Sequence, residues 1–234
     1  FSASVLINNG ASVTNDTNST LSLSAQDDQG ITAYYVSTSS FDTPSVTSSS
    51  WVTVTPSQNY SAEISYSLGY SWASSGQKTV YVWYKDAGGN ISQRASDSIN
   101  LDTQAPSSTS VSTPYSASTQ IIELSLSAYD SSGVSGYYLS SSSFSPSLSS
   151  TGWVTVSPTT SYSATVSYTL AASTGSQSIY AWFRDEAGNI SYSNYDSAYL
   201  ESGFISASAA GDKTAPFSAS VLINNGASVT NDTN

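Results

Sequence analysis

The chain has 234 residues, a net charge of −11 and only 9% charged residues, and it contains no cysteine, histidine or methionine. This acidic balance disfavours nucleic acid as a partner, because the phosphates would be repelled, but it suits hard cations such as Ca²⁺. Without histidine and cysteine, Ser-His and Cys-His nucleophiles and His-ligated zinc are excluded. No apolar run approaches the roughly 20 residues that cross a bilayer. We therefore expect neither an enzyme nor membrane insertion in this segment.

Short runs rich in β-branched and aromatic residues follow one another along the chain. In the first half they are LSLS (21–24), ITAYYVS (31–37), WVTV (51–54), AEISYSL (62–68), KTVYVWYK (78–85) and ISQRASDSINL (91–101). Clusters of Gly, Pro, Asn and Asp separate them, as is typical of strands and turns. No segment keeps helical spacing for long. Seven or so strands in roughly 105 residues predict an all-β fold built from antiparallel sandwiches.

Two levels of repetition organise the chain. Three segments return in altered form, at 22–37 and 125–140, at 51–68 and 153–170, and at 80–92 and 179–191. The stretch FSASVLINNGASVTNDTN, in contrast, occurs unchanged at 1–18 and at 217–234. Self-similarity at a fixed period indicates a repeat protein. We predict two homologous domains, 1–106 and 107–216, that recur as a pair, with 217–234 as the first strand of the next repeat.

The unchanged copy has two explanations, and both lead to a fibre. In the first, the chain is an excerpt of a longer covalent array, whose next domain continues after Asn234. In the second, the terminal strand inserts into the sheet of a neighbouring copy, as in donor-strand assembly. Residues 1–18 already supply the matching strand to the first domain, which favours the first explanation.

The end of each domain carries a resemblance to a known family. The segment YVWYKDAGGNIS (81–92) and the linkers DTQAP (102–106) and DKTAP (212–216) resemble those of tandem bacterial Ig-like and fibronectin-III-like domains of extracellular surface fibres and adhesin stalks. The resemblance implies two tandem Ig-like antiparallel β-sandwiches in a periodic array. It also implies a structural repeat unit of a long filament or adhesin stalk at the cell surface, with copies of itself as partners. The alternative is a carbohydrate-binding accessory module of a secreted protein.

Acidic and amide side chains recur in the same two turns of both domains. They are Asp27, Asp86 and Asn90 in the first domain, and Asp130, Asp185 and Asn189 in the second. The plain interpretation is turn chemistry, because Asp and Asn bond their own backbone and Gly supplies positive φ.

A second interpretation adds the acids of the two linkers. In an Ig-like sandwich both turns lie where the chain enters the domain. Asp102 would then face the turns of the second domain, and Asp212 would face those of the first domain in the next unit. Three or four oxygens around a linker suit Ca²⁺ and would stiffen the joint. The sequence requires no cofactor, but it predicts that a calcium site is feasible at these junctions.

The strands at 80–84 and 179–183 are apolar on both faces. Alternation places Tyr81 and Trp83 on one face of the first, and Tyr180 and Trp182 on the equivalent face of the second. A strand that is apolar on both faces is covered on both. The cover is either the domain's own chain, namely Trp51 or Trp153 with the Ser-rich stretches 38–50 and 141–151, or a neighbouring fibre or sugar ring that contacts these four aromatics.

Overall fold

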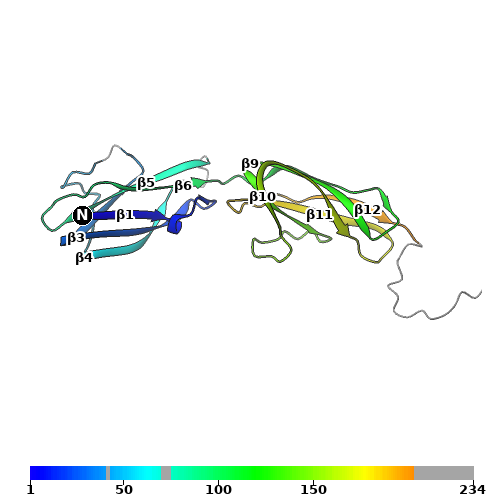
Figure 1. Cartoon of the computed structure of the whole chain (residues 1–234), viewed down its shortest axis with the longest axis horizontal. Coiled ribbons are helices and arrows are strands. Elements are labelled where there is room, and N and C mark those ends of the chain that lie inside the picture. The colour runs from blue at the N-terminus through cyan, green and yellow to red at the C-terminus, as the bar shows by residue number, and fades with distance from the viewer. Residues whose placement is uncertain (41–42, 70–74, 203–234) are drawn as a thin grey trace, which may run out of the picture.

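The computed structural model describes residues 1–40, 43–69 and 75–202, which form two β-sandwiches in succession (Figure 1). The first contains β1 (Ser2–Ile7), β2 (Val13–Thr14), β3 (Asn18–Ser37), β4 (Val52–Ser67), β5 (Gly76–Asp86) and β6 (Ala95–Leu101). The second contains β7 (Ser107–Ser112), β8 (Ser116–Ala117), β9 (Ile121–Ser140), β10 (Val154–Thr169), β11 (Gly175–Asp185) and β12 (Asn194–Leu200). Within the described residues the one helical element is a short 3-10 turn, η1 (Asn8–Gly10). The predicted all-β class is confirmed.

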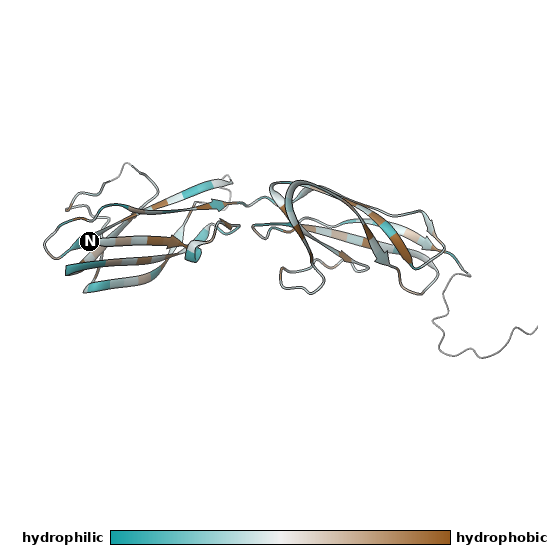
Figure 2. Cartoon of the chain, in the orientation of Figure 1, coloured by the Kyte–Doolittle hydropathy of each residue, from teal (hydrophilic) through white to brown (hydrophobic). Residues whose placement is uncertain are grey.

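Alternation along the strands decides which side chains form each core. At the start of β3, Leu21, Leu23 and Ala25 are buried, whereas Ser22 is half-buried and Ser24 is exposed. This two-residue period is the geometry of a pleated strand with one face in the core. Figure 2 shows the result as bands of apolar and polar residues that alternate along the strands. Many of the outward positions hold serine or threonine, so hydroxyl groups make up much of the solvent-exposed polar surface of the strands.

The strand order is equivalent in the two domains. It is β1-β3-β5-β6-β2 in the first, with β4 paired to β3, and β10-β9-β11-β12-β8 in the second, with β7 paired to β9. All the longer strands pair antiparallel, as predicted. The two-residue strands β2 and β8 are different, because they run parallel to β6 and β12. There the chain leaves the first strand of the domain and crosses over to run beside the last one.

The predicted strands at 21–24 and 31–37 are one continuous strand, β3. Its first part pairs with β1 and with the end of β4, and its second part pairs with β5 and with the start of β4. The register shifts between Gln26 and Ile31, where Gly30 has a φ of +86°. That conformation favours glycine, and a bulge of this kind bends a strand. The bend lets β3 take part in both halves of the sandwich.

Each sandwich is built around its own core. The largest completely buried side chains include Ile7, Leu21 and Tyr84 in the first domain, and Leu124 and Phe183 in the second. The two clusters of buried apolar residues share no member. A separate core is what defines an independent domain. Pro106 lies between β6 and β7, whereas Pro216 and the copy at 217–234 lie outside the described residues.

The two sandwiches lie end to end (Figure 1). β1 begins at the outer end of the first sandwich, and the chain leaves that sandwich at the opposite end to enter the second. None of the helical turns formed by the described residues has the length and hydropathy that a membrane crossing requires.

Candidate functional site

The turn after β11 presents the first carboxylate of the domain junction. Oδ1 of Asp185 accepts hydrogen bonds from the backbone N–H groups of Gly188 (2.7 Å) and Asn189 (2.8 Å). Its Oδ2 accepts a bond from Nδ2 of Asn189 at 2.7 Å. Gly188 has a φ of +93°, which only glycine adopts readily. The Asp-Glu-Ala-Gly-Asn sequence thus closes a tight turn that fixes the Asp185 carboxylate, and only 2% of the residue's surface is exposed.

The bend in β9 presents the second carboxylate. Oδ1 of Asp130 accepts bonds from the backbone N–H groups of Ser132 (2.8 Å) and Gly133 (3.1 Å). This is the local bonding that favours aspartate at the start of a turn. Asp130 is also buried. Both turns therefore contain the bonds that the plain interpretation of these acids predicts.

The linker brings the third carboxylate, Asp102, to the same place. Asp102 extends β6 by one residue, because its backbone N–H donates to the carbonyl of Thr14 at 2.8 Å. Its Oδ1 accepts bonds from Oγ of Ser75 (3.2 Å) and from the backbone N–H of Gln104 (3.0 Å). Its carbonyl accepts a bond from Nδ2 of Asn189 at 2.9 Å, which joins the two domains.

Carboxylate oxygens of Asp102, Asp130 and Asp185, one from each, lie within 4.8 Å of one another. Asp102 is completely buried, and its Oδ2 has no hydrogen-bond partner. Among the described residues, this is the one place where three potential metal ligands lie so close together. The sequence placed Asp102 against Asp130, Asp185 and Asn189, and the structure brings these four residues together.

The crowding of negative charge affects two of the acids. Burial raises the pKa of Asp185, and the charges of Asp102 and Asp130 raise it further, against the hydrogen bonds from Asn189. Burial and the charge of Asp102 likewise raise the pKa of Asp130. Two charges about 4 Å apart repel by about 4 kcal/mol at an effective dielectric constant of about 20. The junction therefore favours whatever neutralises it, either a cation or a proton.

The first domain has the same turns without a linker acid among the described residues. Oδ1 of Asp86 accepts a bond from the backbone N–H of Asn90 (2.8 Å), and Oδ2 accepts one from its Nδ2 (2.7 Å), as in the second domain. Burial raises the pKa of Asp86, but the bonds from Asn90, Gly88 and Gly89 outweigh it, so the pKa lies below its ordinary value. The Asp86 turn shows what the Asp185 turn would be without its acidic neighbours.

Asp27 lies at the same end of the first domain. It accepts a bond from the backbone N–H of Gln29 at 2.9 Å, and its Oδ2 lies 3.9 Å from the amino group of Phe1. Asp212, which the sequence predicts would face this end in the next unit, lies outside the described residues. That junction stays a prediction.

The outer aromatic face is covered by the domain's own chain. Trp83 and Trp182 are 2% and 0% exposed. Tyr35 lies between Trp83 and Trp51, with ring centroids 5.8 Å from each, and Trp51 donates from Nε1 to the carbonyl of Ser45 at 2.8 Å. The interpretation in which Trp51 and its preceding loop form the cover therefore agrees with the structure.

The second domain repeats this cover. Tyr138 lies between Trp153 (5.6 Å) and Trp182 (6.0 Å), and the Arg184 guanidinium lies 4.8 Å from the ring centre of Trp153. A sugar ring or a neighbouring fibre cannot reach Trp83 or Trp182, so we do not retain a contact role for these two. Tyr81 and Tyr180 are half-buried, and their role stays a prediction.

Exposed tyrosines gather near the last strand of the second domain, among them Tyr115, which is 92% exposed and whose carbonyl accepts a bond from the backbone N–H of Tyr199 at 3.1 Å, and three others that the sequence did not single out. Tyr192, Tyr195 and Tyr199 are 95%, 63% and 51% exposed, and the ring centres of Tyr195 and Tyr180 lie 5.3 Å apart. Alternation along β12 is the signal that could have found two of them, because Tyr195 and Tyr199 share the outward face. The equivalent positions of the first domain are Gln93, Ser96 and Asn100, so this surface is particular to the second domain.

The sequence also did not single out one acid in each domain that accepts hydrogen bonds from the end of the first strand or the residue just after it. Oδ2 of Asp97 accepts a bond from the backbone N–H of Ile7 at 2.7 Å. Oδ2 of Asp196 accepts bonds from the backbone N–H (2.8 Å) and Oγ1 (3.0 Å) of Thr113. The available signal was an acid on the same alternating face as Ile99 and Leu101, because an acid on an inward face needs donors.

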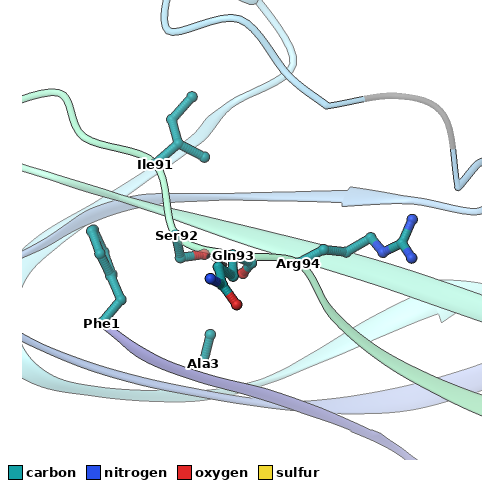
Figure 3. A pocket seen from close by; sticks show the side chains of 6 residues that line it. All are labelled: Phe1, Ala3, Ile91, Ser92, Gln93 and Arg94. Carbon is teal, nitrogen blue, oxygen red and sulfur yellow. Dashed lines mark hydrogen bonds between the residues drawn. The ribbon is translucent and has the colours of Figure 1, made fainter.

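A hollow of about 510 Å³ lies in the first domain between the start of β1 and the segment before β6 (Figure 3). It is lined by Phe1, Ala3, Ile91, Ser92, Gln93 and Arg94. Arg94 points away from the other lining side chains in Figure 3. Its Nη1 donates to the carbonyl of Ser40 at 2.7 Å, and its guanidinium lies 4.6 Å from the ring centre of Tyr81. The hollow presents no carboxylate, and we do not consider it a functional site.

No family model matches the sequence, and no curated protein sequence does. Among solved structures, the chain is similar to the fibronectin(III)-like modules of Clostridium thermocellum CbhA (10% identity, 84% of this chain, 94% of that chain, TM-score 0.46). It is also similar to the D00-D0 domain of intimin (14%, 84%, 96%, 0.34) and to a tetra-tandem repeat in the extending region of a large adhesion protein (20%, 86%, 50%, 0.31). At these identities and scores the likeness is one of fold.

Proposed function

We propose that this chain is a structural repeat unit of an extracellular filament or adhesin stalk, in which tandem sandwiches are joined end to end. The observation that supports this most directly is the burial of Asp102, the first residue of the linker. Segments between domains are ordinarily exposed and flexible. Here Asp102 is completely buried, and its carbonyl is bonded to Asn189 of the second sandwich. A joint of this kind limits bending, so the length of the array grows with the number of copies.

A second contact supports the joint. A methyl group built on Gly188 would lie 3.7 Å from Nδ2 of Asn15, so the loop after β2 approaches the turn after β11 closely. The linker residue Thr103 is also tied back to the first domain, because its backbone N–H donates to Oγ of Ser75 at 3.2 Å. The linker is thus bonded to both domains.

The test is the mass of the polypeptide from its native source after complete denaturation. A mass many times 24.4 kDa is the expected result, since it indicates a covalent tandem array in which residues 217–234 begin the next unit. A mass near 24.4 kDa together with a monomer in solution would overturn the proposal. The same mass with fibres in solution would instead support strand exchange between subunits through the terminal copy.

A second candidate function, the binding of glycans as an accessory module, is favoured by the exposed tyrosines of the second domain. Tyrosines supply rigid rings that stack on apolar faces while the hydroxyl stays solvated. Affinity electrophoresis in gels cast with soluble xylan or β-glucan tests this function. Retardation that is lost when Tyr195 and Tyr199 are changed to Ala would support it, whereas equal mobility with and without polysaccharide would exclude it for these glycans.

A further inference from the structure

The junction contains three buried carboxylates whose described partners are all neutral. The donors to Asp102, Asp130 and Asp185 are backbone N–H groups, the Ser75 hydroxyl and the Asn189 amide. The three acids carry three formal negative charges within 4.8 Å. Buried charges of proteins are ordinarily paired with an opposite charge or coordinate a metal.

Three basic side chains, those of Lys85, Arg94 and Arg184, lie against aromatic rings away from the junction acids. The Lys85 ammonium and the Arg184 guanidinium each lie 4.8 Å from the ring centre of a tryptophan, and Arg94 lies against Tyr81. The ion pair between the amino group of Phe1 and Asp27 lies at the far end of the first domain from the junction. None of these three basic side chains is therefore a partner for the junction acids, whose printed hydrogen-bond donors are all neutral.

The unpaired oxygen Oδ2 of Asp102 also points to a cation. It belongs to a completely buried residue and has no hydrogen-bond donor, whereas the Oδ1 atom of the same carboxylate has two. Leaving a buried acceptor unpaired is costly, and the cost is larger for a charged group. The free oxygen belongs to the same carboxylate that lies among Asp130 and Asp185.

We propose that a divalent cation, Ca²⁺, binds at the junction between Asp102, Asp130 and Asp185 and is part of the folded joint. All the donors are oxygens, and hard oxygen donors favour Ca²⁺ or Mg²⁺ over zinc and copper, which prefer nitrogen and sulfur. Ca²⁺ accepts irregular shells of six to eight oxygens, whereas Mg²⁺ demands a nearly ideal octahedron. The ligands come from two loops and a linker, an arrangement that suits the less demanding ion.

Binding of the cation at this site would depend on how the linker lies against the second domain. Asp102 follows the last strand of the first domain, while Asp130 and Asp185 belong to the second. A cation held by all three can bind fully only when the linker is docked. Its stiffening of the stalk rests on the proposed function, but the binding itself does not.

The two domains provide a matched control. Asp86 accepts the same bonds from Asn90 that Asp185 accepts from Asn189, but among the described residues it belongs to no cluster of three acids. Asp185→Asn and Asp86→Asn therefore perturb the same turn, and only the first removes a proposed ligand.

Asp102→Asn is the more informative variant. Asparagine has the same shape and can still accept the bonds from Ser75 and Gln104, while its amide donates toward the other two acids. This variant should fold at least as well as the wild type in the absence of metal, and it should lose the cation.

The experiment is calorimetric titration of the whole chain with CaCl₂ after treatment with chelator, paired with thermal melts in EGTA, CaCl₂ and MgCl₂. We expect a site with a Kd of roughly 10⁻⁴–10⁻³ M, the range of extracellular calcium modules. Calcium at about 100 times Kd should raise the ratio of folded to unfolded protein about 100-fold. Asp102→Asn and Asp185→Asn should lose both effects, while Asp86→Asn should keep them.

Three results would overturn the proposal. They are the absence of heat and of a melting shift at 10 mM CaCl₂ (about ten times the weakest expected Kd), unchanged binding in folded Asp102→Asn, and equal loss of binding in both turn variants. If Asp102→Asn does not fold by circular dichroism, Asp130→Asn takes its place. A native mass near 24.4 kDa with calcium binding intact would contradict the covalent tandem array but would support the metal site.

Discussion

Tyr84 fastens the first strand of the first domain, and Tyr84→Phe should loosen it. The Tyr84 hydroxyl is in the core, where it donates to the carbonyl of Ser4 on β1 (2.7 Å) and accepts from the backbone N–H of Ser24 on β3 (3.1 Å). Each bond contributes about 0.5–1.5 kcal/mol net. Tyr84→Phe removes both bonds, and we expect a loss of about 1–2 kcal/mol.

Hydrogen exchange of the backbone amides measures this loss where it occurs. A destabilisation of 1–2 kcal/mol changes an opening equilibrium by a factor of about 5–30. The protected amides of β1 should exchange faster by that factor in Tyr84→Phe, since edge strands open locally. β7 of the second domain is the internal control, because Phe183 occupies the equivalent position and has no hydroxyl. Exchange of β1 within twofold of the wild type would refute the reasoning.

The same hydroxyl gives a second measurement, in alkali. Burial raises the pKa of Tyr84 well above the ordinary value of 10, and Tyr60 adds to the effect, against the bond from Ser24. A group whose pKa is higher in the folded state stabilises the fold below its unfolded pKa and loses that contribution as the pH rises above it. The free energy of unfolding of the wild type should therefore fall more steeply above pH of about 10 than that of Tyr84→Phe.

Two further variants test the acid fastener and the aromatic cover. Asp196→Ala should cost the second domain about 1.5–3 kcal/mol at neutral pH in urea titrations, since it removes charged bonds to Thr113. Burial raises the pKa of Asp196, but the hydrogen bonds to its carboxylate outweigh burial and hold the pKa below its ordinary value. The difference in stability between the wild type and Asp196→Ala should therefore vanish as the pH falls through that lowered pKa. A difference that stays constant with pH would contradict this. Trp153→Ala should uncover Trp182, lower stability by about 2 kcal/mol and increase the binding of a fluorescent apolar dye. Unchanged dye binding would mean that the cover is not needed.

The strands could be predicted from local rules, whereas the meeting of Asp102 with Asp130 and Asp185 needed the resemblance to tandem sandwiches as well. Alternation identifies strands, and turn residues identify the hairpins. The resemblance to tandem sandwiches then places the linker at the end where those turns lie. The same turn residues occur at equivalent positions of both domains, so each domain is a check on the turns predicted for the other.

Which segment covers the outer aromatic face could not be predicted from local rules. Trp83 alternates with Val82, and both are apolar, so the pattern does not say what covers the outer side. The cover depends on how the loop before Trp51 returns over Tyr35, which is a tertiary contact. Ser75 was missed for the same reason, since nothing near it in sequence announces a bond to Asp102.

The continuity of β3 is a different failure. The polar stretch Asp-Asp-Gln-Gly reads as a turn between two strands, and its residues do make turn bonds. The strand continues because Gly30 adopts positive φ and the register shifts instead of reversing. Local chemistry alone does not separate a bulge from a reversal, because both use the same residues.

The edge strands β4 and β10 carry features that disfavour the addition of a strand from another chain. Among the described residues β4 pairs only with β3, and β10 only with β9, so each offers a long unpaired edge. Such edges invite another chain to add a strand. Pro56 and Pro158 lie inside these strands, close to the register shifts, and proline removes the N–H that an added strand needs. With a net charge of −11 repelling neighbours as well, strand addition at β4 and β10 is disfavoured.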